Sequence, residues 1–390
     1  MALLLWIIVT CFYIYFGLLY LQFSSFAPLG AMVLPEVVNN LVFTYVVGVV
    51  SVILSYAYFI RKKKSNFGIL NDNNFLSYLS LMYCVFSLGC FIWGIQYYGG
   101  YIAFLRTPYI AIFSGNAENG IKDVLISSSG LMAIFSILCA SQVIKVSRIS
   151  KWILIVSCIV LFSIFVQGRR ETLLLLIMTF ASYRFLSEKI SIKTITKSLL
   201  FVFLLFVFAG LGLYLRASSE TSGGSFLSAI INAVLFETHF TIANLANEIA
   251  THSYNNIPYG GLMFLFYPVF FIVPSFIFSI FGYDKSEVFS FNEPKIYDDK
   301  GGSFIFTEAY HSLGNIGVIC HGVLLGFLIA YFYSSAKASR NMIFHFPLVS
   351  LILVASRKDI IYGIKYISLE FILMFVFYLF YILLPKKTAR

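Results

Sequence analysis

Charged side chains are scarce in this chain of 390 residues, because Asp, Glu, Lys and Arg together make up only 11% of it. A soluble domain carries about 25% charged residues. Hydrophobic residues reach 60%, and the few charges form short clusters between long apolar runs, a pattern typical of many transmembrane helices. Only helices and closed barrels satisfy the backbone in lipid. The sequence therefore predicts an all-α, polytopic integral membrane protein.

Other common site signals are also missing. The formal net charge is +10, but Lys and Arg lie mostly in short loops, as the positive-inside rule requires, so we expect no nucleic-acid partner. The six cysteines show neither metal-ligand nor disulfide spacing. His252, His321 and His345 have no partner at ligand spacing, and no phosphate loop, nucleophile elbow or zinc motif occurs. We therefore expect no metal and no cofactor.

The basic clusters predict the topology. Arg61–Lys64 is the strongest cluster, which places it in the cytoplasm. Two apolar runs precede it, and the last run ends before Lys386, so both termini are expected to be cytoplasmic. The runs lie at about 2–22, 38–60, 75–96, 124–144, 152–166, 199–215, 304–333, 346–356 and 364–384, with one more directly after Glu171. This gives about 10–12 transmembrane helices, depending on whether two further segments of ambiguous placement also cross the membrane.

The ambiguous pair lies in a large external loop region, 216–302, within a single transmembrane domain that covers residues 1–390. One member is an apolar stretch at about 262–282, broken by Pro268 and Pro274. The other is an amphipathic helix at about 229–250. Its apolar face would carry Ile231, Leu235, Ile242, Leu245 and Ile249, and its polar face Glu237, Thr241, Asn244 and Glu248. Either both segments cross the membrane or both lie on its outer side.

This topology gathers ionisable side chains at the outer membrane face. They are Arg169, Arg170, Arg216, Glu308, His311, Arg357 and Asp359, joined by Glu237 and His239 if the amphipathic helix lies there. The positive-inside bias disfavours arginine on this face, which indicates a specific role. One guanidinium group can donate to two phosphate oxygens at once, so several guanidinium groups together suit a pyrophosphate. Snorkelling of the arginines and local pairing of Arg170 with Glu171 are the alternatives.

Residues 301–317, GGSFIFTEAYHSLGNIG, place a Gly-Gly-Ser turn before a polar helix start. Glu308, His311 (or Ser312) and Asn315 would share one face of that helix. Polar groups at the end of an apolar helix are costly in free energy unless they have a function or a polar partner. A polar clamp between helices is the alternative to a catalytic role. Four glycines would let a neighbouring helix approach closely: Gly314, Gly317, Gly322 and Gly326.

With these motifs the chain resembles the O-antigen polymerase (Wzy-type) family. The resemblance is carried by Gly168-Arg-Arg-Glu, by Arg216 at the start of a large loop, by Ile257-Pro-Tyr-Gly-Gly, and by the run 301–317. Members of this family join undecaprenyl-pyrophosphate-linked oligosaccharide repeats in the bacterial inner membrane. Their architecture resembles that of the C-type membrane glycosyltransferases. The resemblance implies an enzyme of O-antigen or capsule-like polysaccharide synthesis, and hence of lipopolysaccharide biosynthesis, that acts on the outer face of this membrane.

The resemblance also implies roles for individual residues. Arg169, Arg170, Arg216 and Arg357 would bind the pyrophosphate, and the base candidates, in falling order, are Glu308, His311, Glu237 and His239. The expected partners are the lipid-linked donor and acceptor and membrane lipid, with a chain-length regulator protein as a further candidate. An O-antigen ligase and a flippase or transporter of the same lipid-linked sugar are the alternatives. A transporter should place ionisable residues at mid-membrane and show matched halves, whereas here they lie at helix ends.

Overall fold

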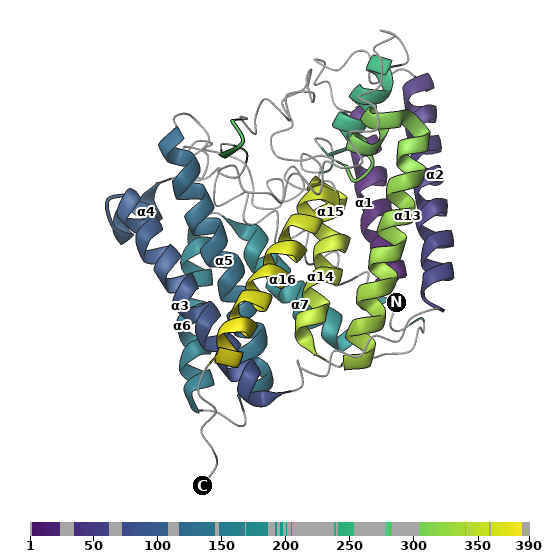
Figure 1. Cartoon of the computed structure of the whole chain (residues 1–390). Coiled ribbons are helices and arrows are strands. Elements are labelled where there is room, and N and C mark those ends of the chain that lie inside the picture. Colours follow the sequence, from purple (N-terminus) through teal and green to yellow (C-terminus); the bar gives the residue numbers. More distant parts are fainter. Residues whose placement is uncertain are drawn as a thin grey trace.

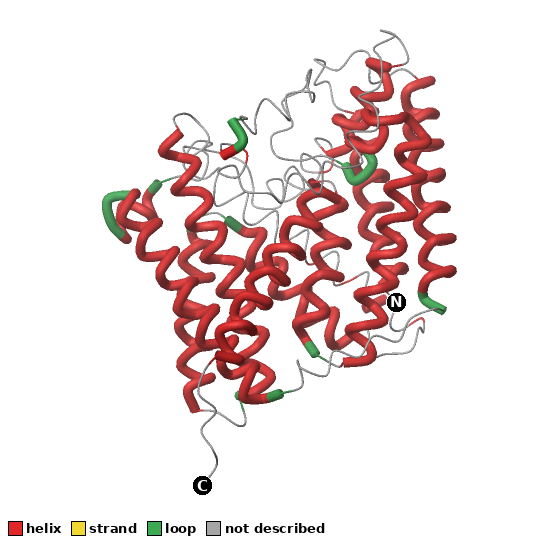
Figure 2. The backbone as a smooth tube through the Cα atoms, viewed as in Figure 1, coloured by secondary structure: helices red, strands yellow, loops and turns green. Residues whose placement is uncertain are grey.

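All regular structure in the described part of the computed structural model is helical (Figures 1 and 2). The structure describes residues 2–23, 35–61, 72–107, 117–144, 148–167, 169–185, 241–252, 304–339, 341–358 and 360–383, with isolated residues between 192 and 282. The predicted run 199–215 and most of the loop region 216–302 lie outside these residues, as does the Pro-broken stretch for the most part.

The described helices coincide with the other predicted apolar runs, except for the short helix α4, which the sequence did not predict. They are α1 (Ala2–Phe23), α2 (Pro35–Phe59), α3 (Asn73–Tyr97), α4 (Tyr101–Arg106), α5 (Ala117–Val143), α6 (Arg148–Val166), α7 (Arg170–Phe185), α13 (Thr307–Ser339) and α16 (Ile360–Leu383). Between α13 and α16 the chain forms four short pieces: η4 (Met342–Phe344), α14 (His345–Val349), the π-helical η5 (Ser350–Val354) and α15 (Ala355–Lys358).

Six of the described helices are long and apolar enough to cross a membrane. Their outward surfaces carry large apolar side chains, such as Phe43 on α2, and Trp152 and Phe162 on α6, which are 58%, 69% and 64% exposed. A water-soluble protein does not display so many such groups, whereas lipid tails solvate them. The chain is therefore a polytopic membrane protein, as the composition predicted.

The helices pack around two apolar cores. The first joins α1, α2, α13 and residues 241–252, and the second joins α3, α5, α6, α7 and much of α16. The segment between α13 and α16 contributes to both, because Leu348 and Leu351 belong to the first core while Phe346 and Val349 belong to the second. In Figure 1 the first group lies on the right and α3, α5 and α6 lie on the left, with α14 and α15 between them.

Close packing of α2 against α13 depends on two of the predicted glycines. A Cβ on Gly322 would lie 2.7 Å from the Cβ of Ser51, and one on Gly326 would lie 2.5 Å from the carbonyl oxygen of Val52. The backbones can approach this closely only because no side chain intervenes. The prediction of close helix approach is confirmed at Gly322 and Gly326.

The first turns of α13 are separated from the rest of the helix by a kink. Leu313 has φ −145° and ψ 22°, and Gly314 has φ 59° and ψ −141°, a left-handed φ that glycine adopts without strain. The kink corrects the prediction that Asn315 shares a face with Glu308 and His311. Asn315 instead accepts a hydrogen bond from the hydroxyl of Thr44 on α2, at 3.0 Å.

Residues 241–252 form a helix at the upper end of the first group, against α1, α2 and the start of α13 (Figure 1). Ile242, Leu245 and Ile249 are fully buried, which confirms the apolar face as far as it is described. The polar face is not exposed either, because Thr241 and Asn244 are also buried. The start of α13 covers this side of the helix, and the main-chain N–H of Phe304 donates to the carbonyl of Thr241 at 3.1 Å.

Candidate functional site

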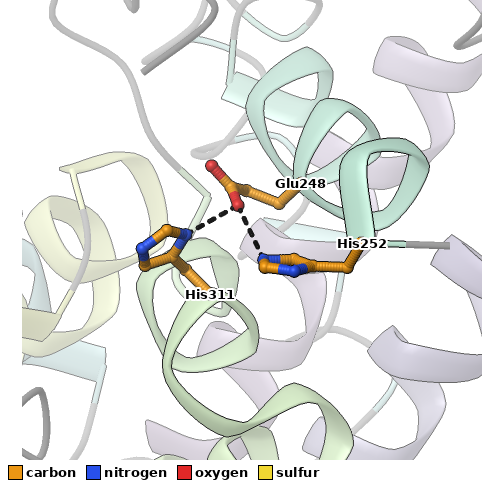
Figure 3. A group of neighbouring side chains, drawn as sticks. All are labelled: Glu248, His252 and His311. Atoms are coloured by element: carbon orange, nitrogen blue, oxygen red, sulfur yellow. Dashed lines mark hydrogen bonds and ion pairs between the residues drawn. The ribbon is translucent and has the colours of Figure 1, made fainter. Parts of the chain in front are cut away.

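Three ionisable side chains meet where the helix 241–252 contacts the start of α13. Oε2 of Glu248 lies 2.8 Å from Nδ1 of His311 and 3.4 Å from Nε2 of His252 (Figure 3). The side chains of Glu248, His252 and His311 are 15%, 2% and 12% exposed. A charge-assisted hydrogen bond in such a desolvated place is stronger than one in water. We refer to these three residues as the Glu-His-His cluster.

Local helix geometry positions two members of the cluster. Glu248 and His252 are four residues apart, so they lie on the same face of one helix, one turn from each other. The ring of His252 also packs near the rings of Tyr310 and His311, with centroids at 6.2 Å and 5.6 Å.

Two phenylalanines before α13 position the third member, His311. Phe304 and Phe306 are fully buried in the first core, where Phe306 packs edge-on against Trp6 and Phe304 packs near Tyr45. These anchors and the kink at Gly314 set the direction of the first turn of α13 independently of the rest of the helix.

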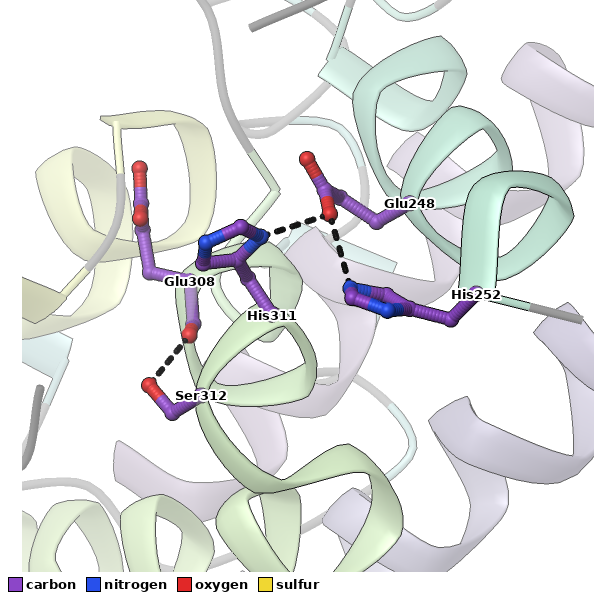
Figure 4. A network of polar contacts seen from close by, with 5 residues as sticks. All are labelled: Glu248, His252, Glu308, His311 and Ser312. Atoms are coloured by element: carbon purple, nitrogen blue, oxygen red, sulfur yellow. Dashed lines mark hydrogen bonds and ion pairs between the residues drawn. The ribbon is translucent and has the colours of Figure 1, made fainter. Parts of the chain in front are cut away.

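Glu308, the first base candidate from the sequence, lies beside the cluster. Its main-chain carbonyl accepts a hydrogen bond from the hydroxyl of Ser312 at 2.8 Å. Figure 4 shows its carboxylate on the opposite side of His311 from Glu248, directed toward the ribbon of the C-terminal helices. The second ring nitrogen of His311, Nε2, faces this same side (Figure 4). The two predicted residues therefore do lie together, but the carboxylate that contacts Nδ1 of His311 belongs to Glu248.

Arg169 lies between α6 and α7 as a buried side chain, only 6% exposed. Its Nε donates to Oε1 of Gln167 at 2.9 Å, and its Nη1 donates to the hydroxyl of Ser127 on α5 at 2.8 Å. These contacts tie the arginine into the second core. Glu171 accepts a hydrogen bond from Tyr366 of α16 at 2.9 Å. Its local pairing with Arg170 stays a prediction, because the Arg170 side chain lies outside the described residues.

The other predicted residues are described less completely. Arg357 is half-buried on α15, a helix that borders the first core through Ala355. Arg170 begins α7, but its side chain is outside the described residues. Four further predicted positions also lie outside the described residues: Arg216, Glu237, His239 and Asp359.

Sequence reasoning missed two of the three members of the cluster. It placed Glu248 only on a polar helix face and treated His252 as structural with no partner at ligand spacing, which the 3.4 Å contact shows to be wrong. The missed signal was the spacing of Glu248 and His252 at i and i+4 on a predicted helix. The approach of His311 depends on tertiary structure and has no signal in the local sequence.

One ionisable side chain departs from the expectation that such groups lie at helix ends. Glu370 lies near the middle of α16, is 1% exposed, and receives no hydrogen bond at either carboxylate oxygen from any described residue. The hydroxyl of Tyr83 on α3 donates to its main-chain carbonyl at 3.4 Å. An intramembrane carboxyl is costly to bury and often functional.

The chain was compared with known proteins on three levels. No family model matches it, no curated protein matches it, and no solved structure matches it. The function is therefore inferred from the residues and geometry of the site.

Proposed function

We propose that this chain is a membrane glycosyltransferase that polymerises undecaprenyl-pyrophosphate-linked oligosaccharide repeats into an O-antigen or capsule-like polysaccharide. One observation carries the proposal. His311, a base candidate on the helix start that resembles the polymerase family, has its Nδ1 2.8 Å from the Glu248 carboxylate. A carboxylate in this position keeps the ring proton on Nδ1, so that Nε2 presents its lone pair as a base.

The pair supplies what glycosyl transfer to a sugar hydroxyl needs. Nε2 of His311 takes the proton of the acceptor hydroxyl while the hydroxyl oxygen bonds to the anomeric carbon of the donor. The bond from that carbon to the pyrophosphate oxygen breaks, and undecaprenyl pyrophosphate leaves with the electron pair. The resulting imidazolium is stabilised by Glu248, as a carboxylate stabilises a catalytic histidine elsewhere.

Arginines would stabilise the charge that develops on the leaving group. Guanidinium groups near the pyrophosphate act on the transition state without a metal. Of the four candidates, Arg357 fits this role well among the described residues, because α15 borders the same core as the cluster and the Glu308 carboxylate is directed toward the C-terminal helices. Both substrates are lipid-tethered, which suits a site at helix ends.

The proposal places the protein in the bacterial inner membrane, and a deletion strain tests it. The polysaccharide is separated on a gel from the deletion strain and from strains complemented with wild type, His311→Ala and, as matched control, His321→Ala on the same helix. A polymerase mutant caps its lipid core with one repeat, whereas a ligase or flippase mutant leaves bare core. We expect single repeats from the deletion and from His311→Ala at normal membrane abundance, and long chains from wild type and the control.

Two results would contradict this proposal. Bare core in the deletion strain would favour the ligase or the flippase. Full-length chains from His311→Ala would remove the base assignment, because loss of a general base typically lowers the rate by about 10²- to 10⁴-fold.

A further inference from the structure

The Glu-His-His cluster has the composition of a transition-metal site. It offers one carboxylate oxygen and two imidazole nitrogens, and these three atoms lie within 4.8 Å of one another. They come from two separate segments, the helix 241–252 and the start of α13, so the site is assembled only in the folded chain. Imidazole and carboxylate together suit zinc and similar ions better than magnesium or calcium, which prefer oxygen ligands alone.

The two distances from the carboxylate oxygen to the imidazole nitrogens fit such an ion after a small adjustment. Zinc binds nitrogen and oxygen at about 2.0–2.2 Å, so neighbouring ligands of a tetrahedral ion lie about 3.4 Å apart. Oε2 of Glu248 and Nε2 of His252 lie at 3.4 Å. Oε2 and Nδ1 of His311 lie at 2.8 Å, the length of a hydrogen bond, and would separate by about 0.6 Å when a metal replaces the shared proton.

The surroundings of the cluster also suit a bound ion. One carboxylate lies between two histidines whose ring centroids are 5.6 Å apart, and all three side chains are at most 15% exposed. A cluster of ligand atoms shielded from water in this way stabilises a bound cation, because the attraction between the cation and the carboxylate is weakly screened. Three protein ligands would leave a fourth position open for water or substrate.

We infer that Glu248, His252 and His311 bind one divalent transition-metal ion of the zinc type. The metal site itself does not depend on the enzymatic proposal, but its consequence rests on the proposed function. A metal on Nδ1 of His311 requires the ring proton to be on Nε2, so this nitrogen no longer accepts a proton from the acceptor sugar. Occupancy of the site therefore inhibits glycosyl transfer.

Metal titration of the purified protein tests the inference. The full chain is purified in detergent with a histidine-free tag, stripped with a chelator, and titrated with Zn²⁺ by calorimetry and with Co²⁺ by visible absorption. We expect one ion per chain and a tetrahedral Co²⁺ spectrum. His252→Ala and His311→Ala should each weaken binding by about tenfold or more, since loss of even an indirect metal partner has this effect. His321→Ala, on α13 but outside the cluster, should bind as wild type does.

Gel filtration of every variant checks folding separately. A further variant, Glu248→Gln, keeps the side-chain shape but removes the charge. A monodisperse Glu248→Gln protein with weakened binding supports the site. Binding that is absent from wild type, or unchanged in the monodisperse His252→Ala and His311→Ala proteins, overturns it. Stimulation of chain extension by bound Zn²⁺ overturns the inhibitory role.

Failure of the metal site and failure of the proposed function give different results. A deletion strain that still makes long chains refutes the proposed polymerase activity and leaves the number of metal ions bound per chain unaffected. A wild-type protein without a bound ion refutes the metal site and leaves the gel pattern unaffected.

Discussion

Nδ1 of His311 lies 2.8 Å from Oε2 of Glu248, although the two residues are 63 positions apart in the chain. The contact brings a carboxylate from the loop region to a histidine in the first turn of the membrane helix α13. It makes the orientation of the imidazole depend on Glu248.

Glu248→Gln is expected to lower chain extension per enzyme molecule by about 10- to 1000-fold, because the amide cannot stabilise an imidazolium as a carboxylate does. Polymerisation of a lipid-linked repeat by purified protein measures the effect, with membrane abundance followed in parallel. Glu248→Asp, which retains the charge on a shorter side chain, should be less impaired than Glu248→Gln. Equal activity of Glu248→Gln and wild type would refute the pairing as a catalytic feature.

Arg169 and Arg357 should respond differently to substitution. Arg169→Ala leaves the buried acceptor on Gln167 without its donor, at about 1–3 kcal/mol, and also removes the hydrogen bond to the half-buried Ser127, so thermal stability and abundance should fall. Arg357→Lys should instead reduce activity per molecule by about 10²- to 10³-fold at normal abundance, because Lys keeps the charge but loses the planar fork. Unfolding in detergent and chain length on gels separate the two. A stable but inactive Arg169→Ala protein would return this residue to the pyrophosphate site.

Gly326→Ala is expected to destabilise the packing of α2 against α13 by about 1–3 kcal/mol, because the new methyl group meets the carbonyl oxygen of Val52. Gly89 in the middle of α3 is a matched control, since nothing lies within 4 Å of a Cβ placed there. Gly89→Ala should leave stability unchanged or raise it by about 0.5–1 kcal/mol. Thermal melting of both variants in the same detergent checks the difference, and equal melting temperatures would argue against the close approach.

Glu370→Met tests the buried carboxyl on α16. An apolar side chain of similar size removes a buried polar group that no described residue hydrogen-bonds, so we expect stability to rise by about 1–3 kcal/mol. Thermal unfolding measures this, and polysaccharide length is read from the same strain. A more stable protein with normal chains identifies Glu370 as structural. Loss of chains in a stable protein would instead favour an intramembrane role of the kind expected in a transporter.

Reporter fusions test the predicted topology. Fusions after Lys64 and at the C-terminus should read as cytoplasmic, and fusions near Glu220 and Asp298 should read as external. The reason is the concentration of Lys and Arg at 61–64 and at the C-terminal end. Alkaline phosphatase and green fluorescent protein give opposite signals on the two sides and serve as each other's control. A cytoplasmic signal near Asp298 would place Glu308 and His311 on the wrong side for the proposed reaction.

The membrane helices were predictable from the sequence because hydropathy and basic clusters act locally, and α2, α3 and α16 begin and end within a few residues of the expected runs. His311 and Glu308 were predictable for the same reason, since polar groups are conspicuous at the start of an apolar helix. The partner of His311 was not, because its contact with Glu248 depends on how distant segments pack. The kink at Gly314 also escaped prediction, since glycine in a membrane helix is more often a packing residue.

An unbroken helix transmits a displacement at one end along its whole length, because each backbone N–H donates a hydrogen bond to the carbonyl four residues earlier. In α13 the conformation of Leu313 and Gly314 interrupts this transmission. A saccharide that pushes on His311 would therefore tilt only the first turn, while Gly322 and Gly326 keep the remainder fixed against α2. In the proposed glycosyltransferase, the start of the helix could thus adjust to acceptors of different shape without loosening the part of the protein that is held in the bilayer.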